Sequence, residues 1–294
     1  MLSILIPTYN YTVLPLVQEV SNQCVNEGIL FEVIVLDDAS TMPCSENIKI
    51  NSLTNCTYTL LSKNIGRSAI RNLLARKASF NNLLFLDADV RLIKKSFIKN
   101  YVSFINDKPN YAVVYGGIVY QEQKPANKQL LRWIYGNKRE ALTADKRNEN
   151  KYISFLTLNF LIKKDVFNTT HFNEEIPNLR YEDLLFSYDL MNNNVDVQHI
   201  DNQVVHNGIE TSDIFLKKTK DSLKGLNFLL TNNYLPENYA KITTVCTLLK
   251  QTRLLILVHV FYNTFKNSFE KNLTSNKPSL LIYDIYRLGY FSQL

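Results

Sequence analysis

Residues 83–89 read Leu83-Leu84-Phe85-Leu86-Asp87-Ala88-Asp89, an apolar run closed by two carboxylates. The apolar residues indicate a buried β-strand, and because side chains alternate along a strand, Asp87 and Asp89 should leave its end on one face. Two carboxylates this close repel each other unless a cation lies between them. Carboxylate oxygens suit Mg²⁺ or Mn²⁺, which usually takes its remaining ligands from water and a substrate's phosphates. We therefore expect a divalent metal here; two solvated aspartates in a surface turn are the alternative.

The composition is that of a globular protein. With 294 residues and 46% apolar content, the chain can bury a sizeable core. Its four cysteines are far apart in the sequence and include no C-x-x-C pair, which argues against a disulfide framework and thiolate metal sites. Met1–Ile6 is too short for the apolar region of a secretory signal and runs directly into Pro7. We therefore expect the protein in the reducing cytoplasm.

Short β-rich apolar runs alternate with helical patterns through the first 90 residues. Strands are expected at residues 2–6, 31–36, 57–61 and 83–86, and helices at residues 13–24 and 68–78. Nearly continuous apolar strands that alternate with helices indicate a mostly parallel sheet covered on both faces, an α/β fold. Further on, the pattern predicts a helix at 94–104, a strand at 112–116, an apolar run at 153–162 and a helix from about residue 164.

Three of these strands are followed by polar residues. The first ends in Thr8-Tyr9-Asn10, the second in Asp37-Asp38 and the fourth in Asp87-Ala88-Asp89. Ligands of open α/β sheets bind outside the carboxyl ends of the strands. We therefore expect these three groups to converge on one crevice.

Two segments of the second half are unusually polar. Residues 121–151 are rich in lysine and contain the only tryptophan, Trp133. A long polar segment inside a compact domain is usually functional, so we expect a lid or an acceptor-binding loop here. The stretch Arg180-Tyr181-Glu182-Asp183 opens a helical pattern, where the helix dipole stabilises acidic residues whether or not they have a further role.

The excess positive charge lies near the end of the chain. Residues 211–294 carry 11 Lys and Arg against 5 Asp and Glu, which accounts for the whole net charge of +6. The same region contains the apolar run Leu254–Tyr262, far shorter than the ~20 residues of a membrane-spanning helix. The basic residues around this run are Lys250, Arg253, Lys266 and Lys271. Two interpretations stay open: the run rests on an anionic membrane surface, or it packs on the main domain with its lysines in water.

Several of these groups, in this order, resemble the motifs of inverting family 2 glycosyltransferases with a GT-A fold. The resemblance extends from Ser3 to about His206, and it is specific because order and spacing match together. Its members are Ile4–Asn10, Glu32–Ser40, Asn64–Gly66 with Ala69–Asn72, Asp87–Asp89, Asn159–Lys164, Phe172–Glu174, Glu182–Asp183 and His206. Residues 211–294 match none of the motifs.

The resemblance implies a Rossmann-like GT-A domain at residues 1–210, with a mostly parallel sheet and helices on both faces. Residues 1–90 would form its nucleotide-sugar half and residues 91–210 its acceptor half. Residues 211–294 would then be a basic, mainly helical C-terminal extension.

The resemblance also implies how the donor is bound. Pro7, Thr8 and Tyr9 would line the nucleotide base, with the tyrosine ring as a stacking surface. Asp38, in preference to Asp37, would accept the imide N–H of uracil. One of these two aspartates is expected to be structural and to cap the turn that follows them.

Further site residues follow from the same likeness. Arg71, in preference to Arg67, would contact the diphosphate. Asp89 would be the direct metal ligand, with Asp87 nearer the ribose or a metal-bound water and His206 as a further ligand. Asp183 would be the catalytic base, since inverting transfer needs a carboxylate that takes the proton of the acceptor hydroxyl. Residues expected to contact or support the acceptor are Asn159, Glu182 and Trp133.

These assignments predict a hexosyltransferase that depends on Mn²⁺ or Mg²⁺ and moves a sugar, with inversion, from a nucleotide sugar. A UDP-linked donor is expected, with a saccharide or lipid-linked saccharide as acceptor, as in cell-surface polysaccharide synthesis, and no nucleic-acid partner. A nucleotidyltransferase is one alternative, but Pro7–Tyr11 lacks the glycine-rich loop that it needs, and no G-x-G-x-x-G supports an oxidoreductase. A non-catalytic nucleotide-sugar-binding subunit is the other, against which the intact Asp87, Asp89 and Asp183 argue.

Overall fold

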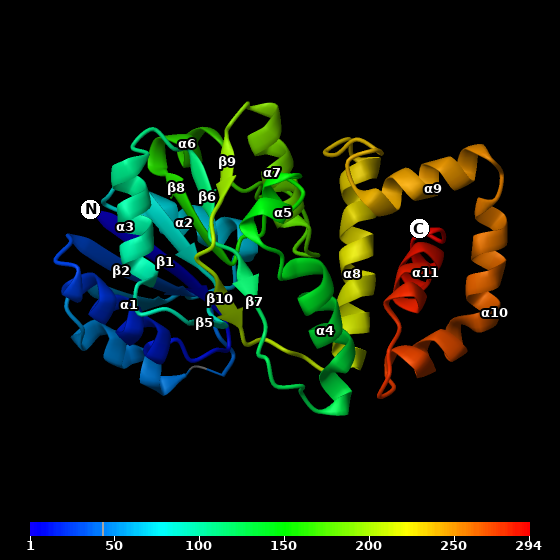
Figure 1. Ribbon diagram of the computed structural model, residues 1–294, viewed down its shortest axis with the longest axis horizontal. Helices are drawn as coiled ribbons and strands as arrows, with labels where there is room; N and C mark the ends of the chain where they lie inside the picture. Colours follow the sequence, from blue (N-terminus) through cyan, green and yellow to red (C-terminus); the bar gives the residue numbers. More distant parts are fainter. Residues whose placement is uncertain (43) are drawn as a thin grey trace. The chain divides into compact units, whose positions relative to one another are not determined.

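The computed structural model describes residues 1–42 and 44–294 (Figure 1). They form two compact units. The first unit comprises residues 1–120, 141–175 and 182–208, and the second comprises residues 121–140, 176–181 and 209–294. The second unit therefore includes two segments from within the predicted 1–210 domain. A functional division at residues 90 and 210 stays a prediction.

A mostly parallel sheet forms the centre of the first unit. Among the described residues it has seven strands, in the order β3-β2-β1-β4-β8-β6-β9. The strands are β1 (Leu2–Thr8), β2 (Phe31–Asp37), β3 (Cys56–Leu60), β4 (Asn82–Leu86), β6 (Val113–Tyr115), β8 (Asn159–Lys163) and β9 (Val197–His199). Only β8 runs antiparallel to its neighbours, β4 and β6. This confirms the predicted α/β fold with a mostly parallel sheet.

Helices cover both faces of this sheet. Ile4, Leu5 and Ile6 are consecutive on β1 and all fully buried, which requires cover on both sides. Helix α2 packs against β1 and β2, whereas α1 and α3 pack against each other (Figure 1). The helices of this unit are α1 (Leu14–Asn26), the 3₁₀ helix η1 (Ser45–Ser52), α2 (Arg67–Lys77), α3 (Phe97–Asp107), α5 (Ala144–Asn148), α6 (Lys164–Thr169) and α7 (Glu182–Asn192).

The strand register brings the polar strand ends together. Thr8 at the end of β1 lies opposite Asp37 at the end of β2, and Leu5 lies opposite Phe85 on β4. The backbone N–H of Asp38 donates to the Thr8 carbonyl at 2.9 Å. The carboxyl ends of β1, β2 and β4 therefore meet at one edge of the sheet, as the sequence predicts.

A second, smaller sheet lies in the same unit. It consists of β5 (Val90–Leu92), β10 (Val204–His206) and β7 (Ile118–Val119) in the order β5-β10-β7. Strand β5 begins directly after Asp89, and its first residue, Val90, lies opposite His206 on β10. This pairing places His206 next to the aspartates although more than a hundred residues separate them in the chain.

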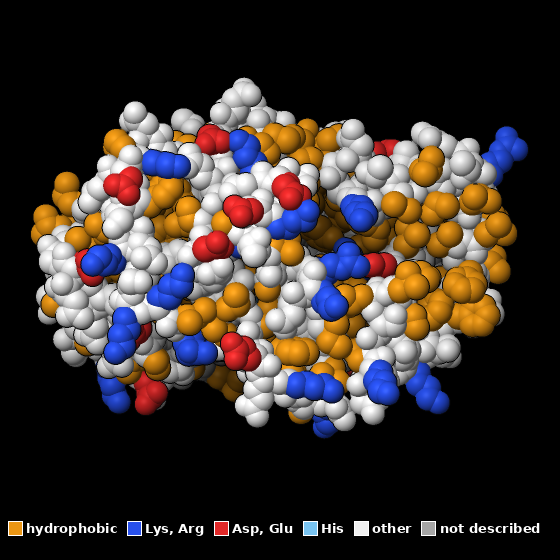
Figure 2. Space-filling model, viewed as in Figure 1, with side chains coloured by type: hydrophobic (Ala, Val, Ile, Leu, Met, Phe, Trp, Pro, Cys, Tyr) orange, Lys and Arg blue, Asp and Glu red, His pale blue; other side chains and the backbone are white. Residues whose placement is uncertain are grey.

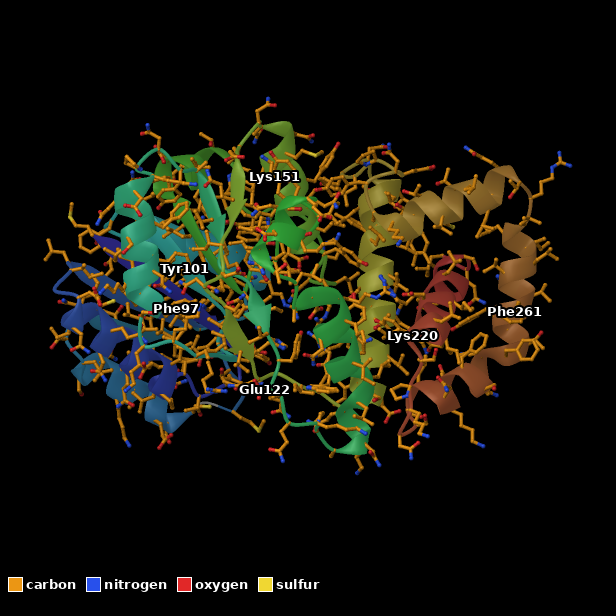
Figure 3. All side chains as sticks on the ribbon, viewed as in Figure 1. Phe97, Tyr101, Glu122, Lys151, Lys220 and Phe261 are labelled. Carbon is orange, nitrogen blue, oxygen red and sulfur yellow. The ribbon has the colours of Figure 1, made fainter. Side chains whose placement is uncertain are left out.

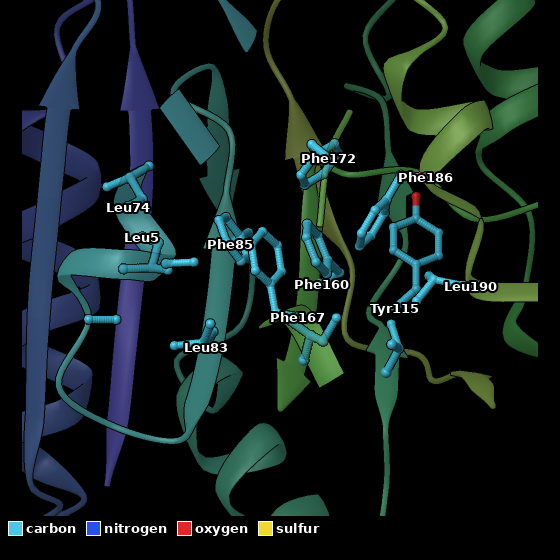
Figure 4. Packing of buried hydrophobic residues seen from close by; sticks show 14 of the residues in the cluster. Leu5, Leu74, Leu83, Phe85, Tyr115, Phe160, Phe167, Phe172, Phe186 and Leu190 are labelled. Carbon is cyan, nitrogen blue, oxygen red and sulfur yellow. The ribbon is translucent and has the colours of Figure 1, made fainter. Parts of the chain in front are cut away.

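Aromatic residues build one face of the core. Phe160 on β8 stacks on Phe85 of β4 with ring centroids 4.8 Å apart, and Phe172 stacks on Phe186 of α7 at 4.2 Å. Figure 4 shows these four rings in one cluster together with the labelled Phe167. All four are almost completely buried, so their packing fixes α7 against the sheet.

The structure corrects the prediction for residues 121–151. The segment is not a loop but contains four short helices: η2 (Asn127–Gln129), α4 (Leu130–Tyr135), the π-helix η3 (Gly136–Glu140) and α5 (Ala144–Asn148). The apolar pair Leu130 and Leu131 anchors it because both side chains are fully buried. Only the last part of the apolar run at 153–162 forms a strand, since β8 begins at Asn159.

The second unit is helical, which confirms the predicted C-terminal helices. Besides η2, α4 and η3 it contains α8 (Ser212–Thr231), α9 (Lys241–Gln251), α10 (Leu255–Leu273) and α11 (Leu280–Phe291). One of its apolar clusters joins α4, α8, α10 and α11, and its buried members are Leu131, Leu216, Tyr262, Phe269, Leu273, Tyr283 and Tyr286.

The aromatic packing generates a prediction about stability. Phe160→Ala should lower the free energy of unfolding by about 3–5 kcal/mol, because it leaves a cavity among Phe85, Phe155 and Phe186. Ile48→Ala, at a side chain that is mostly exposed, should change it by less than about 0.5 kcal/mol. Urea denaturation measures both values. A loss below about 1 kcal/mol for Phe160→Ala would contradict the packing described here.

Candidate functional site

A cleft of about 220 Å³ opens at the carboxyl ends of β1, β2 and β4. Seven of the predicted donor-site residues line it: Pro7, Thr8, Tyr9, Asp38, Arg71, Asp87 and Asp89. The strand ends supply six of the seven, because parallel strands place their carboxyl ends side by side, and α2 supplies Arg71. The sequence prediction of one crevice therefore agrees with the structure.

Asp37 does not line this cleft. Its Oδ1 accepts hydrogen bonds from the Ser40 backbone N–H at 2.8 Å and the Ser40 hydroxyl at 2.6 Å, and its Oδ2 accepts one from the Tyr58 hydroxyl at 2.8 Å. These bonds hold a tight turn in which Ala39 has a φ of 58°. Asp37 thus makes the turn-capping contacts that were expected of one member of the pair.

Asp38 joins the cleft to the start of helix α2. Its Oδ1 accepts from the Ile65 backbone N–H at 2.7 Å and its Oδ2 from the Gly66 N–H at 3.0 Å. Gly66 precedes α2 with a φ of 85°, a conformation that favours glycine. A carboxylate has about four lone-pair positions, so both oxygens keep room for another donor.

Arg71 is the buried cation of the site. Its Nη2 lies 2.8 Å from Asp87 Oδ1 and its Nη1 3.7 Å from Glu182 Oε1. The guanidinium also lies over the Phe172 ring, 5.4 Å from the centroid. Burial disfavours the charged form, but the charges of Asp87 and Glu182 outweigh it and raise the pKa of Arg71. Arg71 therefore connects α2 to the end of β4 and to the first turn of α7.

Asp87 and Asp89 have different partners. Asp87 is paired with Arg71, yet burial raises its pKa, and the charge of Asp89 raises it further. Asp89 Oδ2 lies 3.3 Å from His206 Nε2. Among the described residues, no partner is found for the buried His206 Nδ1. Arg71 thus balances the charge of Asp87, and Asp89 faces the imidazole. The divalent metal expected between the two carboxylates stays a prediction.

The ligand types around Asp89 suit Mn²⁺ or Mg²⁺. A carboxylate and an imidazole fit such an ion, which leaves further positions for water and phosphate oxygens. In residues 1–42 and 44–294 no group of three or more His, Cys, Asp or Glu side chains is arranged to hold a metal. The residues therefore fit a site with Asp89 and His206 as protein ligands, rather than one with all three predicted ligands in place.

Asp183 lies in the first turn of α7 and is not among the residues that line the cleft. Its Oδ1 accepts from the Leu184 backbone N–H at 2.8 Å. Burial and the neighbouring Glu182 charge raise the pKa of Asp183 to about 6, against the opposing effect of the Leu184 N–H and Arg71. A carboxylate with this pKa is ionised at neutral pH and a stronger base than an ordinary aspartate.

The remaining predicted residues lie elsewhere. Asn159 is fully buried, accepts from the Tyr101 hydroxyl at 2.8 Å, and donates to the carbonyls of Gly117 at 3.1 Å and Asn202 at 2.9 Å. These are contacts of a residue that supports the fold. Trp133 belongs to the second unit, where its indole N–H donates to the Gln121 carbonyl at 2.8 Å, and its role with an acceptor stays a prediction.

Sequence reasoning missed two residues at this site. Tyr11 lines the cleft, two residues after Tyr9, and this spacing of aromatics after a strand is a signal that could have found it. Gly208 leaves no room for a side chain, because a Cβ atom there would collide with the Asp89 carboxylate. No sequence pattern reveals that contact, since it depends on the fold that brings β10 to β5.

Comparison with known proteins identifies the family. The model of glycosyl transferase family 2 matches residues 3–171, more than half of the chain. The chain belongs to this family. This match confirms the family resemblance that the sequence motifs indicate. A search of curated proteins found no match.

Several solved structures share the fold of this chain, among them structures of TarS and of a mannosyltransferase. S. aureus TarS 1–349 is 20% identical with a TM-score of 0.51, and the match covers 76% of this chain and 65% of that one. The mannosyltransferase PcManGT of Pyrobaculum calidifontis, in complex with GDP-Man and Mn²⁺, is 16% identical with a TM-score of 0.54, and the match covers 78% and 64%. TarS 1–349 in complex with UDP-GlcNAc matches 98% of this chain and 90% of that one, at 17% identity and a TM-score of 0.51. These likenesses support the GT-A fold, and the chain spans slightly less than two thirds of the first two.

The position of Gly208 generates a second prediction. Gly208→Ala should displace the Asp89 carboxylate, and the predicted Mn²⁺-dependent binding of nucleotide should then weaken about 10- to 100-fold, the usual effect of disturbing the support of a metal ligand. Calorimetric titration of UDP with and without Mn²⁺ measures this. Binding in Mn²⁺ at the wild-type affinity would contradict either the close approach of Gly208 to Asp89 or the predicted role of Asp89 as a metal ligand.

Proposed function

We propose that this family 2 protein is an inverting, metal-dependent hexosyltransferase that uses a UDP-sugar. The observation that carries the proposal is the cleft at the ends of β1, β2 and β4, where an exposed tyrosine, a buried arginine and three aspartates gather. Such a combination offers a surface for a base, cationic charge for a diphosphate and oxygen ligands for a metal.

The nucleotide would occupy the cleft beside β1. Tyr9 is nearly half exposed and offers its ring for stacking, and Asp38 retains lone pairs for the imide N–H of uracil. Two TarS structures contain UDP and UDP-GlcNAc, and PcManGT contains GDP-Man. Guanine also presents a ring N–H, so UDP is the choice to be tested against GDP.

Asp89 and His206 would hold Mn²⁺ or Mg²⁺, which when bound neutralises charge that grows on the leaving diphosphate. PcManGT, which shares the fold, is a Mn²⁺ complex. Arg71 supplies fixed positive charge at the same edge of the cleft, and its pairing with Asp87 and Glu182 keeps it in place. Asp87 therefore pairs with Arg71, whereas Asp89 would bind the metal.

Asp183 would be the base. Its carboxylate takes the proton of the acceptor hydroxyl as that oxygen bonds to the anomeric carbon from the face opposite the diphosphate. The bond between the anomeric carbon and the diphosphate oxygen breaks, and its electron pair leaves with the nucleoside diphosphate. A base with a pKa of about 6 suits this step near neutral pH. The acceptor we propose is a hydroxyl of a saccharide or lipid-linked saccharide, as in the synthesis of cell-surface polysaccharides.

Asp89→Ala tests the metal assignment. The variant should lose sugar transfer, and UDP with Mn²⁺ should no longer raise its thermal stability. A ligand stabilises the folded state in proportion to its affinity, and loss of the metal ligand would lower that affinity. Its fold should persist, since a strand-end side chain contributes little packing. A thermal-shift series with UDP, GDP and either ion measures binding. Wild-type turnover of the variant in Mn²⁺ would refute the assignment.

Asp183→Asn tests the base. Donor affinity should stay near wild type while kcat falls about 10²-fold or more. In the wild type, kcat should drop as pH falls through about 6, because protonation of Asp183 removes the base. The pH profile of Asp183→Asn should lack this step. Equal losses in donor binding and in kcat would instead assign Asp183 a structural role at the start of α7.

A further inference from the structure

The second unit exposes an apolar face on α9 and α10. The most exposed side chains of this face are Leu248, Ile256, Leu257, Val260, Phe261 and Phe265. On α10 they form two neighbouring rows, Ile256 with Val260 and Leu257 with Phe261 and Phe265, and members of each row are four residues apart, so they share one side of the helix. Figure 2 shows hydrophobic side chains gathered in the part of the molecule where Figure 1 places α10.

A different side of α10 already packs within the unit. Tyr262, Phe269 and Leu273 are buried against the cluster that includes Tyr283 and Tyr286 of α11. Figure 3 shows the labelled Phe261 pointing away from α11. The exposed face is therefore additional to the side that holds the helix in place, and Ile256 and Leu257 are still 68% and 61% exposed.

The charge around this face is almost entirely positive. Residues 241–273 contain five cations, Lys241, Lys250, Arg253, Lys266 and Lys271, and a single acid, Glu270. Glu270 is already engaged, since it lies 3.2 Å from Lys220 Nζ and accepts from the Tyr286 hydroxyl at 2.7 Å. A second acid, Glu237, lies next to α9, where its Oε2 accepts from the Thr247 hydroxyl at 2.9 Å. The five cations still outnumber these two acids, so the region keeps a net positive charge.

The length of these helices restricts what the face can do. No single helix within the described residues is long and apolar enough to cross a membrane. Helices α9 and α10 reach that length and apolar character only together, as a pair bent by 114°. An apolar surface with a basic border instead fits the boundary between lipid headgroups and acyl chains.

We propose that the α9–α10 face binds the surface of an anionic membrane. Its apolar side chains would enter the headgroup region, while the lysines and the arginine contact acidic headgroups. A second copy of the chain fits less well, because symmetric docking would bring two positive borders together. Among the two interpretations of the sequence, the structure therefore favours the membrane over packing of the whole apolar run.

Vesicle sedimentation with the full chain tests the proposal. The protein should sediment with equimolar phosphatidylglycerol and phosphatidylcholine vesicles at low salt and much less with phosphatidylcholine alone. High salt should weaken binding because it screens the basic residues. Lys250→Gln with Arg253→Asn should weaken binding about 30-fold, at roughly fivefold for each charge. Asparagine is chosen at position 253 because φ there is 61°.

Ile256→Gln with Leu257→Gln tests the apolar contribution, since glutamine keeps the helix propensity. This variant should also lose most binding. Leu30→Gln with Ile48→Gln is the matched control, because these residues of the first unit are 65% and 66% exposed. Lys95→Gln with Lys99→Gln is the control for charge. Both controls should bind as the wild type does.

Two results would overturn the proposal. One is the absence of sedimentation with anionic vesicles at low salt. The other is binding that Ile256→Gln with Leu257→Gln leaves unchanged. Sedimentation equilibrium without lipid shows whether the face joins two copies instead: a dimer abolished by that variant, together with no vesicle binding, would assign the face to self-association. Circular dichroism confirms that each variant remains folded.

Discussion

The position of Arg71 between Asp87 and Glu182 is the constraint on which the candidate site depends. A buried guanidinium is tolerated only when carboxylates compensate its loss of hydration. Asp87 comes from the end of β4 and Glu182 from the start of α7, so the electrostatic requirement of one residue on α2 fixes the other two elements. The same bonds determine where Asp183, the next residue along α7, is held.

The two pairs of neighbouring aspartates show how one residue type takes different roles. Asp37 stabilises a turn, and Asp38 holds the backbone that leads into α2 while still lining the cleft. Asp87 balances a buried cation, and Asp89 lies beside an imidazole. Strand alternation separates the adjacent Asp37 and Asp38, whereas Asp87 and Asp89 differ because Asp87 follows β4 and Asp89 directly precedes β5. The proposed chemistry uses the members that keep room for a ligand.

The second unit shows a different use of apolar surface. Its inner cluster follows the usual rule that a helix buries one side against its neighbours. The face on α9 and α10 does not, because large aliphatic and aromatic side chains stay in contact with solvent. Exposed apolar area of this extent costs solubility and usually marks a contact surface. The basic residues around this face favour contact with an anionic surface.

The sequence by itself determined the α/β class, the strand ends and most of the residues that line the cleft. These features are local: hydrophobic periodicity marks strands and helices, and polar residues directly after an apolar strand must lie at its carboxyl end. The helix that begins at Glu182 was predictable for the same reason, since acidic residues favour the first turn. The prediction of a loop at 121–151 was wrong because the helices of this segment are short and their polar residues obscure the helical periodicity.

Only the tertiary structure decided which of these residues meet. The pairing of β5 with β10 brings His206 to Asp89, and the packing of α7 brings Glu182 to Arg71; both contacts join segments about a hundred residues apart. Likewise, only the structure distinguishes the side of α10 that packs on α11 from the side that is exposed. Sequence patterns record the preference of each segment for burial or for a conformation. They do not record partners, because these are selected when the segments compete for the same buried surface and the same opposite charges.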